Sequence, residues 1–318
     1  MNATPLHERM HLVILSHNRL ECLQRLLQNV AVPMARRGMQ VTLVDNGSDQ
    51  ALRSFLREFK DVPNIDILLL QENAGVAKGR NAGFRRSSRE IVVYLDDDAL
   101  IDPALLEQVP RRFDGMPDAG IIAFRVVHGV SGEAQNEHGP ACTMVGNFHG
   151  AGHAIRREVL DQVGYLDETC FFGAEEVELS MHALVRGWKT VYVPDLLVRH
   201  FSIPRSGTDR VRRRVHWARN YAMVLFRYLP PGVAALFTTR LLASYLWWGF
   251  KDLKFPAIVL PFAVAHGALR GIRTRNPLPA EGVAFYRNPA TRPEIGNVSL
   301  MSKLFRRGAV QAYPDHRE

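Results

Sequence analysis

The chain has 318 residues, of which 47% are hydrophobic and 23% charged, and its formal net charge is +8. This composition can bury a large core and excludes a globally disordered chain. The positive charge indicates an acidic partner, a description that nucleic acid, anionic lipid and nucleotide phosphates all meet. The three cysteines (Cys22, Cys142 and Cys170) form no CxxC pair, which argues against a zinc site or a disulfide framework and favours a reducing compartment.

The first half of the chain alternates between strand-like and helix-like segments. Compact apolar runs predict strands at residues 11–15, 40–44, 65–70 and 91–95. Apolar residues at helical spacing predict intervening helices near residues 20–30, 52–59 and 76–86. The first run is too short for the core of a signal peptide, so we expect the protein in the cytoplasm. The alternation predicts an α/β domain with a mostly parallel sheet over residues 1–205, and ligands bind such sheets at the carboxyl ends of the strands.

The pattern changes after about residue 119. It predicts a strand at 121–127, a loop rich in Gly and His at 129–152, a helix at 175–186, and strands at 190–193 and 197–200. His149 and His153 are four residues apart, a spacing that suits metal ligands on a helix. The glycines between them make a helix unfavourable, so we place both histidines in a loop on the substrate side rather than at a zinc ion.

Residues 206–275 are predicted to form a basic and partly apolar helical extension, and the Pro- and Arg-rich residues 276–318 a loose tail. The extension contains two apolar runs, but Arg240 interrupts the first, and Pro256 and Pro261 break the second. We therefore expect a helical hairpin that lies on the inner face of the cell membrane or docks on a partner. The alternative is a buried helical extension. Aromatic residues are sparse among the arginines, so we do not expect nucleic acid as a partner.

Polar residues follow each of the four predicted N-terminal strands, and the most distinctive are Asp96, Asp97 and Asp98. Carboxylates this close repel one another unless a cation lies among them, and Mg²⁺ prefers carboxylates together with phosphate oxygens. The alternative is a solvated turn that caps the next helix, but Asp102, followed by Pro103, already supplies that cap. The chain contains no GxxxxGK[ST], GxGxxG or GxSxG motif, so the aspartates are the best candidates for binding a phosphate, through a metal.

Taken together, these segments resemble the family 2 glycosyltransferases of the GT-A fold, especially the bacterial rhamnosyltransferase-like branch. The matching segments are VDNGSD at 44–49, the stretch 73–83, LDDD at 95–98, GYLDETCFFGAEEVEL at 164–179, WKTVYVPDLLVRH at 188–200, and Arg219-Asn220. Each is weak alone, but six in the same order are specific. The resemblance covers residues 12–200 well and residues up to 277 more loosely. It implies a GT-A domain at 1–205 that binds a nucleotide-sugar donor.

The resemblance also assigns roles at the strand ends. It implies a divalent ion, Mg²⁺ or Mn²⁺, at a DxD motif in which Asp98 contacts the metal, with His200 completing the metal site. The donor-binding residues that it implies are Ser16, Asn18 and Asp45 at the base and ribose, Arg80 and Asn81 at the ribose or diphosphate, and Asp96 and Asp97 in the DxD segment.

The predicted catalytic base lies at the start of the helix at 175–186. The family usually has Glu-Asp there, with the Asp as the base, whereas this chain has Glu175-Glu176, so Glu176 reaches one methylene further. The alternative is that these acidic residues only stabilise the positive end of the helix dipole. As the base, Glu176 would deprotonate the acceptor hydroxyl in a single displacement that inverts the anomeric configuration.

The sequence thus predicts a metal-assisted glycosyltransferase that extends a lipid-linked or cell-surface glycan at the membrane. Two alternatives remain open. A soluble small molecule as acceptor would not require the apolar extension, and a non-catalytic sugar-nucleotide-binding scaffold would account for the altered Glu175-Glu176 pair.

Overall fold

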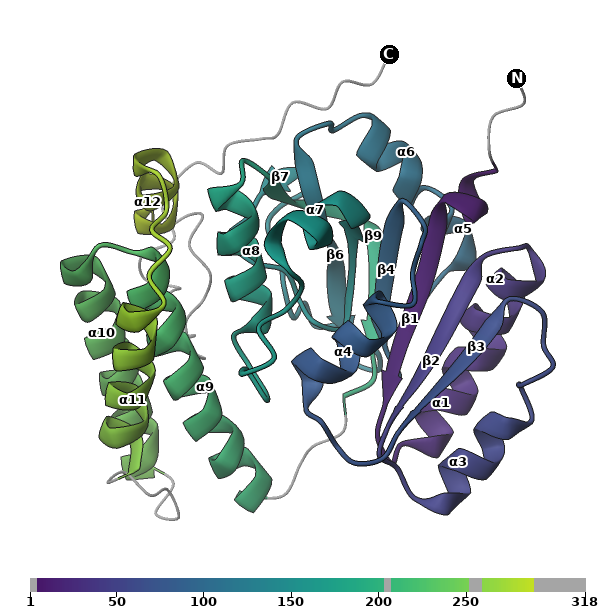
Figure 1. Ribbon diagram of the computed structural model, residues 1–318, viewed down its shortest axis with the longest axis horizontal. Helices are drawn as coiled ribbons and strands as arrows, with labels where there is room; N and C mark the ends of the chain where they lie inside the picture. The colour runs from purple at the N-terminus through teal and green to yellow at the C-terminus, as the bar shows by residue number, and fades with distance from the viewer. Residues whose placement is uncertain (1–4, 203–206, 252–258, 289–318) are drawn as a thin grey trace.

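The computed structural model describes residues 5–202, 207–251 and 259–288 and shows an α/β fold around one curled sheet (Figure 1). The strand order in the sheet is β3-β2-β1-β4-β8-β6-β9-β5, and β7 pairs with β9. This arrangement confirms the predicted α/β class, with helices on both faces of the sheet.

The N-terminal half of the sheet is parallel, as predicted. Its strands are β1 (Met10–Ser16), β2 (Gln40–Asn46), β3 (Ile65–Leu70) and β4 (Ile91–Asp96). The elements before and between them are the 3-10 helix η1 (Leu6–Arg9), α1 (Leu20–Leu26), the π-helical turn η2 (Leu27–Ala31), α2 (Val32–Arg36), α3 (Gln50–Arg57) and α4 (Val76–Phe84). Right-handed crossovers of this kind bring the carboxyl ends of the four strands to one edge.

The second half of the sheet mixes strand directions. Its strands are β5 (Ala99–Ile101), β6 (Ala119–His128), β7 (Thr143–Met144), β8 (Gly152–Arg156) and β9 (Lys189–His200). Its helices are α5 (Pro103–Leu106), α6 (Val109–Asp114), α7 (Arg157–Val163) and α8 (Glu175–Val185). Asp102 caps α5 as predicted, since its side chain accepts a hydrogen bond from the Ala104 amide.

Two predictions about this half were wrong. The strands expected at 190–193 and 197–200 are one strand, β9, whose pairing with β6 skips from Val193 to Leu197. A proline interrupts the ladder at this skip, and it has no N–H to donate. His153 is not in a loop: it lies in β8, where it is buried between the rings of Tyr94 and Phe148.

Alternating strand residues supply the cores on the two faces of the sheet. In β1, Leu12 and Ile14 face one cluster, which covers α1 and α3, while Val13 and Leu15 face the other, which includes α4 and α8. This two-residue period is what a strand buried on both faces requires. The sheet is therefore held rigidly on both sides, which fixes the positions of its strand ends.

The C-terminal helices form a further core against α8, separate from the two cores on the faces of the sheet. They are α9 (Gly207–Tyr228), α10 (Pro231–Lys251), α11 (Val259–Arg273) and α12 (Ala280–Arg287), and they lie beyond α8 at one end of the sheet (Figure 1). No helix in the described ranges is long and apolar enough to cross a membrane. Part of the second apolar run, including Pro256, lies outside the described residues.

The predicted loose tail at 276–318 is wrong for its first part. Residues 280–287 form α12, and its Tyr286 is buried with the hydroxyl donating to the carbonyl oxygen of Gly146 at 2.7 Å. The flanking prolines and arginines concealed this short helix, whose packing depends on residues far away in the sequence. Residues 289–318 lie outside the described part of the chain.

The close contact between α9 and α11 depends on two glycines. A Cβ atom at Gly267 would lie 1.9 Å from the carbonyl oxygen of Arg219, and one at Gly271 would lie 2.2 Å from that of Met223. We expect Gly267→Ala to lower the free energy of unfolding by about 1–3 kcal/mol, because the backbone of α9 cannot move aside cheaply. Gly232→Ala is the matched control, since nothing lies within 4 Å of its Cβ position. Urea unfolding measures both, and equal effects would show that the contact is not tight.

Candidate active site

The polar ends of the parallel strands meet at one edge of the sheet. Ser16 of β1 is in register with Asp45 of β2, and Leu15 is in register with Asp96 of β4. His200 reaches the same edge from the other half of the sheet, because β5 and β9 pair antiparallel with Ala99 opposite His200. The fold therefore brings together residues that are more than 180 positions apart in the chain, 16 to 200.

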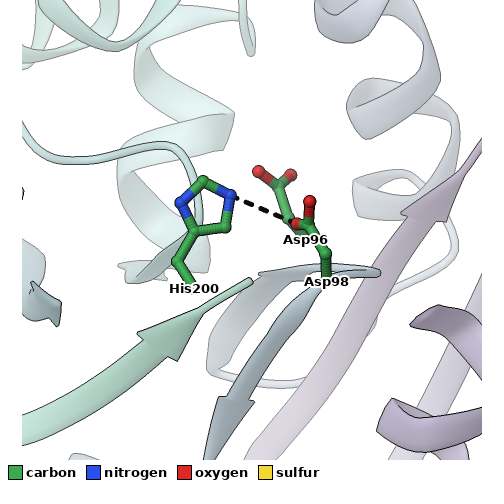
Figure 2. A group of neighbouring side chains, drawn as sticks. All are labelled: Asp96, Asp98 and His200. Atoms are coloured by element: carbon green, nitrogen blue, oxygen red, sulfur yellow. Dashed lines mark ion pairs between the residues drawn. The ribbon is translucent and has the colours of Figure 1, made fainter. Parts of the chain in front are cut away.

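Asp96, Asp98 and His200 form a group that suits a metal ion. One ligand atom from each lies within 4.8 Å of the others, and the three side chains point toward one another (Figure 2). His200 Nε2 lies 3.2 Å from Asp98 Oδ1. Two carboxylates and an imidazole are ligand types that divalent ions accept in proteins, so these residues fit a divalent ion.

Charges around this group shift its ionisation. Although burial acts to raise it, the pKa of Asp98 is held below its ordinary value by His200 and Arg19. Burial acts to lower the pKa of His200, but the Asp98 carboxylate overcomes it and raises that pKa. Both shifts favour a charged pair in the absence of a metal.

Gln135 sets the orientation of His200. Its Oε1 lies 2.7 Å from His200 Nδ1. Because an amide oxygen only accepts, Nδ1 carries the hydrogen and Nε2 is directed at the carboxylates. The Gln135 backbone is itself held to β6, since its amide donates to the Val126 carbonyl oxygen at 2.9 Å. Nothing in the loop sequence at 129–152 singled out this residue.

Gln135→Leu is expected to weaken Mn²⁺ binding by about tenfold, because outer residues that fix a ligating histidine typically contribute that much. Gln135→Glu should retain most of the affinity, since its carboxylate still accepts from Nδ1. Titration of Mn²⁺ followed by electron paramagnetic resonance measures both variants. An unchanged affinity in the leucine variant would contradict the orienting role.

Arg19 was not assigned a role from the sequence, but it lies between two of the aspartates. It forms an ion pair with Asp98 and contacts Asp97 Oδ1 with its Nη2 at 2.5 Å. Asp97 is fully buried and also accepts a hydrogen bond from Ser16 Oγ at 2.7 Å. Burial raises the pKa of Asp97 to about 7, against the attraction of Arg19. Asp97 thus supports Arg19 and Ser16 from beneath the metal group and does not belong to that group.

The predicted base and ribose pocket contains Asn18 and Asp45 at different depths. Asn18 is exposed with a positive φ of 53°, and its Oδ1 accepts from the Asp49 amide at 2.8 Å. Asp45 is fully buried and accepts from Arg53 Nε and from the Ser48 amide, both at 2.9 Å. Asn18 is therefore accessible to a ligand, whereas both carboxylate oxygens of Asp45 are already used inside the protein.

Arg80 links the metal group to the predicted base. Its Nη1 donates to Glu176 Oε1 at 2.9 Å, and its Nη2 lies 3.6 Å from Asp96 Oδ1. The guanidinium lies over the Tyr94 ring, 4.4 Å from its centroid, and the residue is 3% exposed. Such a buried cation holds both carboxylates in fixed positions.

Asn81 lies further from the open edge than the resemblance implies. It is fully buried, and its amide exchanges hydrogen bonds with the Leu166 backbone while also donating to Glu168 Oε1. These contacts use both ends of the amide to hold the segment before α8. Its predicted contact with the donor would require them to break.

Glu175 and Glu176 have different environments. The Glu175 side chain is 3% exposed, and its Oε2 has no hydrogen-bond partner among the described residues. Burial, together with the neighbouring Glu176, raises the pKa of Glu175 to about 8. Glu176 is more open, with 17% of its side chain exposed, and pairs with Arg80. Of the two, Glu176 is the carboxyl group that is more accessible from outside.

This difference predicts a pH dependence. The carboxyl group of Glu175 has its ordinary pKa of 4.5 in the unfolded chain and a pKa of about 8 in the folded protein. Between these two pH values the folded protein keeps a proton that the unfolded chain has lost. The free energy of unfolding therefore falls as the pH rises through this window. Glu175→Gln removes this loss. The free energy of unfolding of the variant, relative to that of the unmodified protein, should therefore rise by at least about 1 kcal/mol between about pH 5 and pH 8. Urea unfolding at both pH values measures the gain, and a pH-independent difference would contradict it.

His149 lies in the predicted loop, beside the metal group. Its ring is 5.6 Å from that of His200, and its Nδ1 accepts from the Ala151 amide at 3.1 Å. Burial lowers the pKa of His149 to about 4, so the ring is neutral at physiological pH. Because Nδ1 accepts, Nε2 carries the hydrogen, and His149 is a neutral donor rather than a metal ligand.

Comparisons with known proteins agree with this geometry. The model of the family described as glycosyl transferase family 2 matches residues 11–177, and that of glycosyltransferase like family 2 matches residues 143–220. The chain is similar to poly-beta-1,6-N-acetyl-D-glucosamine synthase of Staphylococcus aureus, with 22% identity over 226 residues. That alignment covers 66% of this chain and 54% of the relative, so the chain spans about half the length of the curated relatives it matches.

Solved structures show the same fold. The mannosyltransferase PcManGT of Pyrobaculum calidifontis, in complex with GDP-Man and Mn²⁺, matches with a TM-score of 0.57 and 19% identity over 84% of this chain and 88% of that one. S. aureus TarS 1–349 in complex with UDP-GlcNAc matches with a TM-score of 0.55 and 15% identity, covering 68% and 66% of the two chains. At these identities the matches establish the GT-A fold.

Proposed function

The chain belongs to glycosyl transferase family 2. We propose that it transfers a sugar from a nucleotide-sugar donor and inverts the configuration at the anomeric carbon with the help of a divalent ion. Asp96, Asp98 and His200 are the residues that would hold the ion, Mg²⁺ or Mn²⁺. When bound, the ion offsets the negative charge that develops on the departing diphosphate. The observation that carries the proposal is the position of Arg80, which joins Asp96 of this group to Glu176.

The residues of the chain divide the remaining work between them. Glu176 accepts the proton of the acceptor hydroxyl as that oxygen attacks the anomeric carbon. Asn18 contacts the nucleoside at the exposed edge, with Ser16 and Asp45 beneath it. Arg80 keeps Glu176 and Asp96 in place, and neutral His149 donates a hydrogen bond at the leaving-group side. A product that retains the donor configuration, identified by NMR, would contradict inversion.

The acceptor is proposed to be a glycan, lipid-linked or at the cell surface. This proposal is supported by the similarity to a polysaccharide synthase and by the outer face of α11. Phe262 is 73% exposed there and Leu269 57%, with Arg270 and Arg273 on the same helix. Apolar side chains beside arginines suit the interface of an anionic membrane. We therefore place the protein at the cytoplasmic face of the membrane.

A thermal-shift panel tests the donor site. The protein is heated with UDP, GDP, dTDP or CDP, each with and without Mn²⁺. Saturation at 100 times Kd stabilises a folded protein by about 2.7 kcal/mol, so one nucleotide should raise Tm only when the metal is present. No shift with any nucleotide would contradict the proposed metal-assisted donor site.

Vesicle sedimentation tests the membrane contact. The protein should pellet with vesicles of phosphatidylglycerol but not with those of phosphatidylcholine, and Phe262→Ser with Leu269→Ser should abolish binding. Val130→Ser is the control, because Val130 is 83% exposed on a distant loop. If the double variant still pellets, α11 is not the contact surface, and an unmodified protein that never pellets would favour a soluble acceptor.

A further inference from the structure

The turn that precedes α8 has an unusual backbone. Gly173 and Ala174 both have positive φ, at 83° and 72°, and they lie directly before Glu175 and Glu176. The left-handed region is easy for glycine but unfavourable for alanine, so Ala174 must be held there by its surroundings. Ala174 also supplies no side-chain cap to α8. The direction in which the first turn of α8 emerges therefore depends on contacts from outside the helix.

Those contacts come from α9 in the C-terminal extension. Asn220 is 1% exposed, and its Nδ2 donates to the carbonyl oxygens of Phe172 at 3.1 Å and Gly173 at 2.9 Å. Its Oδ1 in turn accepts from Arg219 Nε at 3.0 Å. The amide is thus fully used, and both of its donated bonds go to the strained turn.

The turn is also held by packing and from the opposite side. A Cβ atom at Gly173 would lie 2.0 Å from Trp217 Cδ1, so the indole of α9 lies directly against the turn. Across the site, the Val76 amide at the start of α4 donates to the Phe171 carbonyl oxygen at 2.9 Å. The turn is therefore fixed between α4, on the donor side, and α9.

From these contacts we infer that Asn220 is a positioning residue for the catalytic base: it holds the turn at Phe172 to Ala174 so that Glu176 points at the acceptor. The C-terminal extension then completes the active site rather than being an appendage to the GT-A domain. This inference rests on the proposed role of Glu176. The hydrogen bonds of Asn220 to described residues go to the turn and to Arg219, and not to Asp96, Asp98 or His200, so its loss should affect the orientation of the base and leave donor binding intact.

The test compares two variants of Asn220 with a control on the same helix. Asn220→Asp keeps the shape but replaces the donor with an oxygen that repels the two carbonyl groups, and Asn220→Ala removes the side chain. Val224→Ala is the control, because Val224 is equally buried in α9 and belongs to its apolar core. If Asn220→Asp does not fold, Asn220→Ala carries the test.

Both Asn220 variants should lower kcat by about 100-fold, the effect of a small misplacement of a reacting group, while the donor KM and the Mn²⁺ Kd change less than about twofold. In hydrogen exchange, the amides of residues 171–178 should exchange at least about tenfold faster in these variants and remain protected in Val224→Ala. Equal exchange in all three, or a parallel loss of donor binding, would overturn the inference. Absence of transfer by the unmodified protein would instead refute the proposed function, and the exchange data would still decide whether Asn220 holds the turn.

Discussion

Glu176→Gln is expected to lower kcat for sugar transfer by about 10²–10⁴-fold, the range over which a positioned base accelerates a proton transfer. The amide oxygen can still accept the hydrogen bond that Glu176 Oε1 receives from Arg80 at 2.9 Å, so the fold around the site should persist. What is lost is the capacity to take up the acceptor proton. The measurement is a steady-state assay with the nucleotide sugar chosen by the thermal-shift panel.

Two further variants sharpen this result. Glu176→Asp shortens the side chain to the length usual in the family and should retain more activity than the glutamine variant. Glu175→Gln should leave kcat within about tenfold, because buried Glu175, with its pKa raised to about 8, is already protonated at neutral pH. If the Glu175 variant lost more activity than the Glu176 variant, the two assignments would be reversed.

Asp98→Asn is expected to weaken Mn²⁺ binding by more than about 100-fold, since loss of a ligand exceeds the usual cost of losing an outer contact. The neutral amide cannot balance the positive charge of the ion. Metal-dependent stabilisation by nucleotide should disappear with it. Electron paramagnetic resonance measures free Mn²⁺, and the thermal shift provides an independent measure.

Asp97→Asn is the matched control for that experiment. It makes the same chemical change one residue away, at a carboxyl group whose pKa is already raised to about 7 by burial. The asparagine oxygen can still accept from Arg19, and its amide nitrogen can donate to Ser16 Oγ, which then accepts, so we expect the Mn²⁺ affinity to remain within about tenfold. If both variants lost the metal equally, the effect would come from a collapse of the whole segment at 96–98.

The parts of the fold with a strong local pattern were predictable from the sequence. The compact apolar runs at 11–15 and 91–95 gave correct strands, and Asp102 gave a correct helix cap. The helix at 280–287 was missed because Tyr286 packs on Gly146, a contact that no local pattern reports. β9 was divided in two because Pro194 breaks its apolar run, although the strand continues past a shift in its register with β6.

In the candidate site, too, local motifs were predictable from the sequence and packing contacts were not. The resemblance to family 2 glycosyltransferases implied Asp96, Asp98 and His200 as parts of one site, and the structure brings these three residues together. Arg19 and Gln135 were assigned no role, since an arginine after a strand and a glutamine in a loop are common and acquire meaning only from their neighbours. The burial of Asp97 and Asn81 is likewise a consequence of packing rather than of motif. The motifs therefore indicated the candidate ligands, whereas only the three-dimensional contacts show which residues hold those side chains in place.

The core between α8 and the C-terminal helices also has a consequence for how the chain folds during its synthesis. The strands of the parallel half leave the ribosome early, and N-terminal segments generally begin to fold first. Val177 and Met181 on α8, however, are buried by residues of α9 and later helices. Helix α8 therefore remains uncovered until the ribosome has translated some fifty to one hundred more residues, up to Tyr286. During this interval its apolar face is available to chaperones, and the newly made protein completes this core only after its last helices have docked.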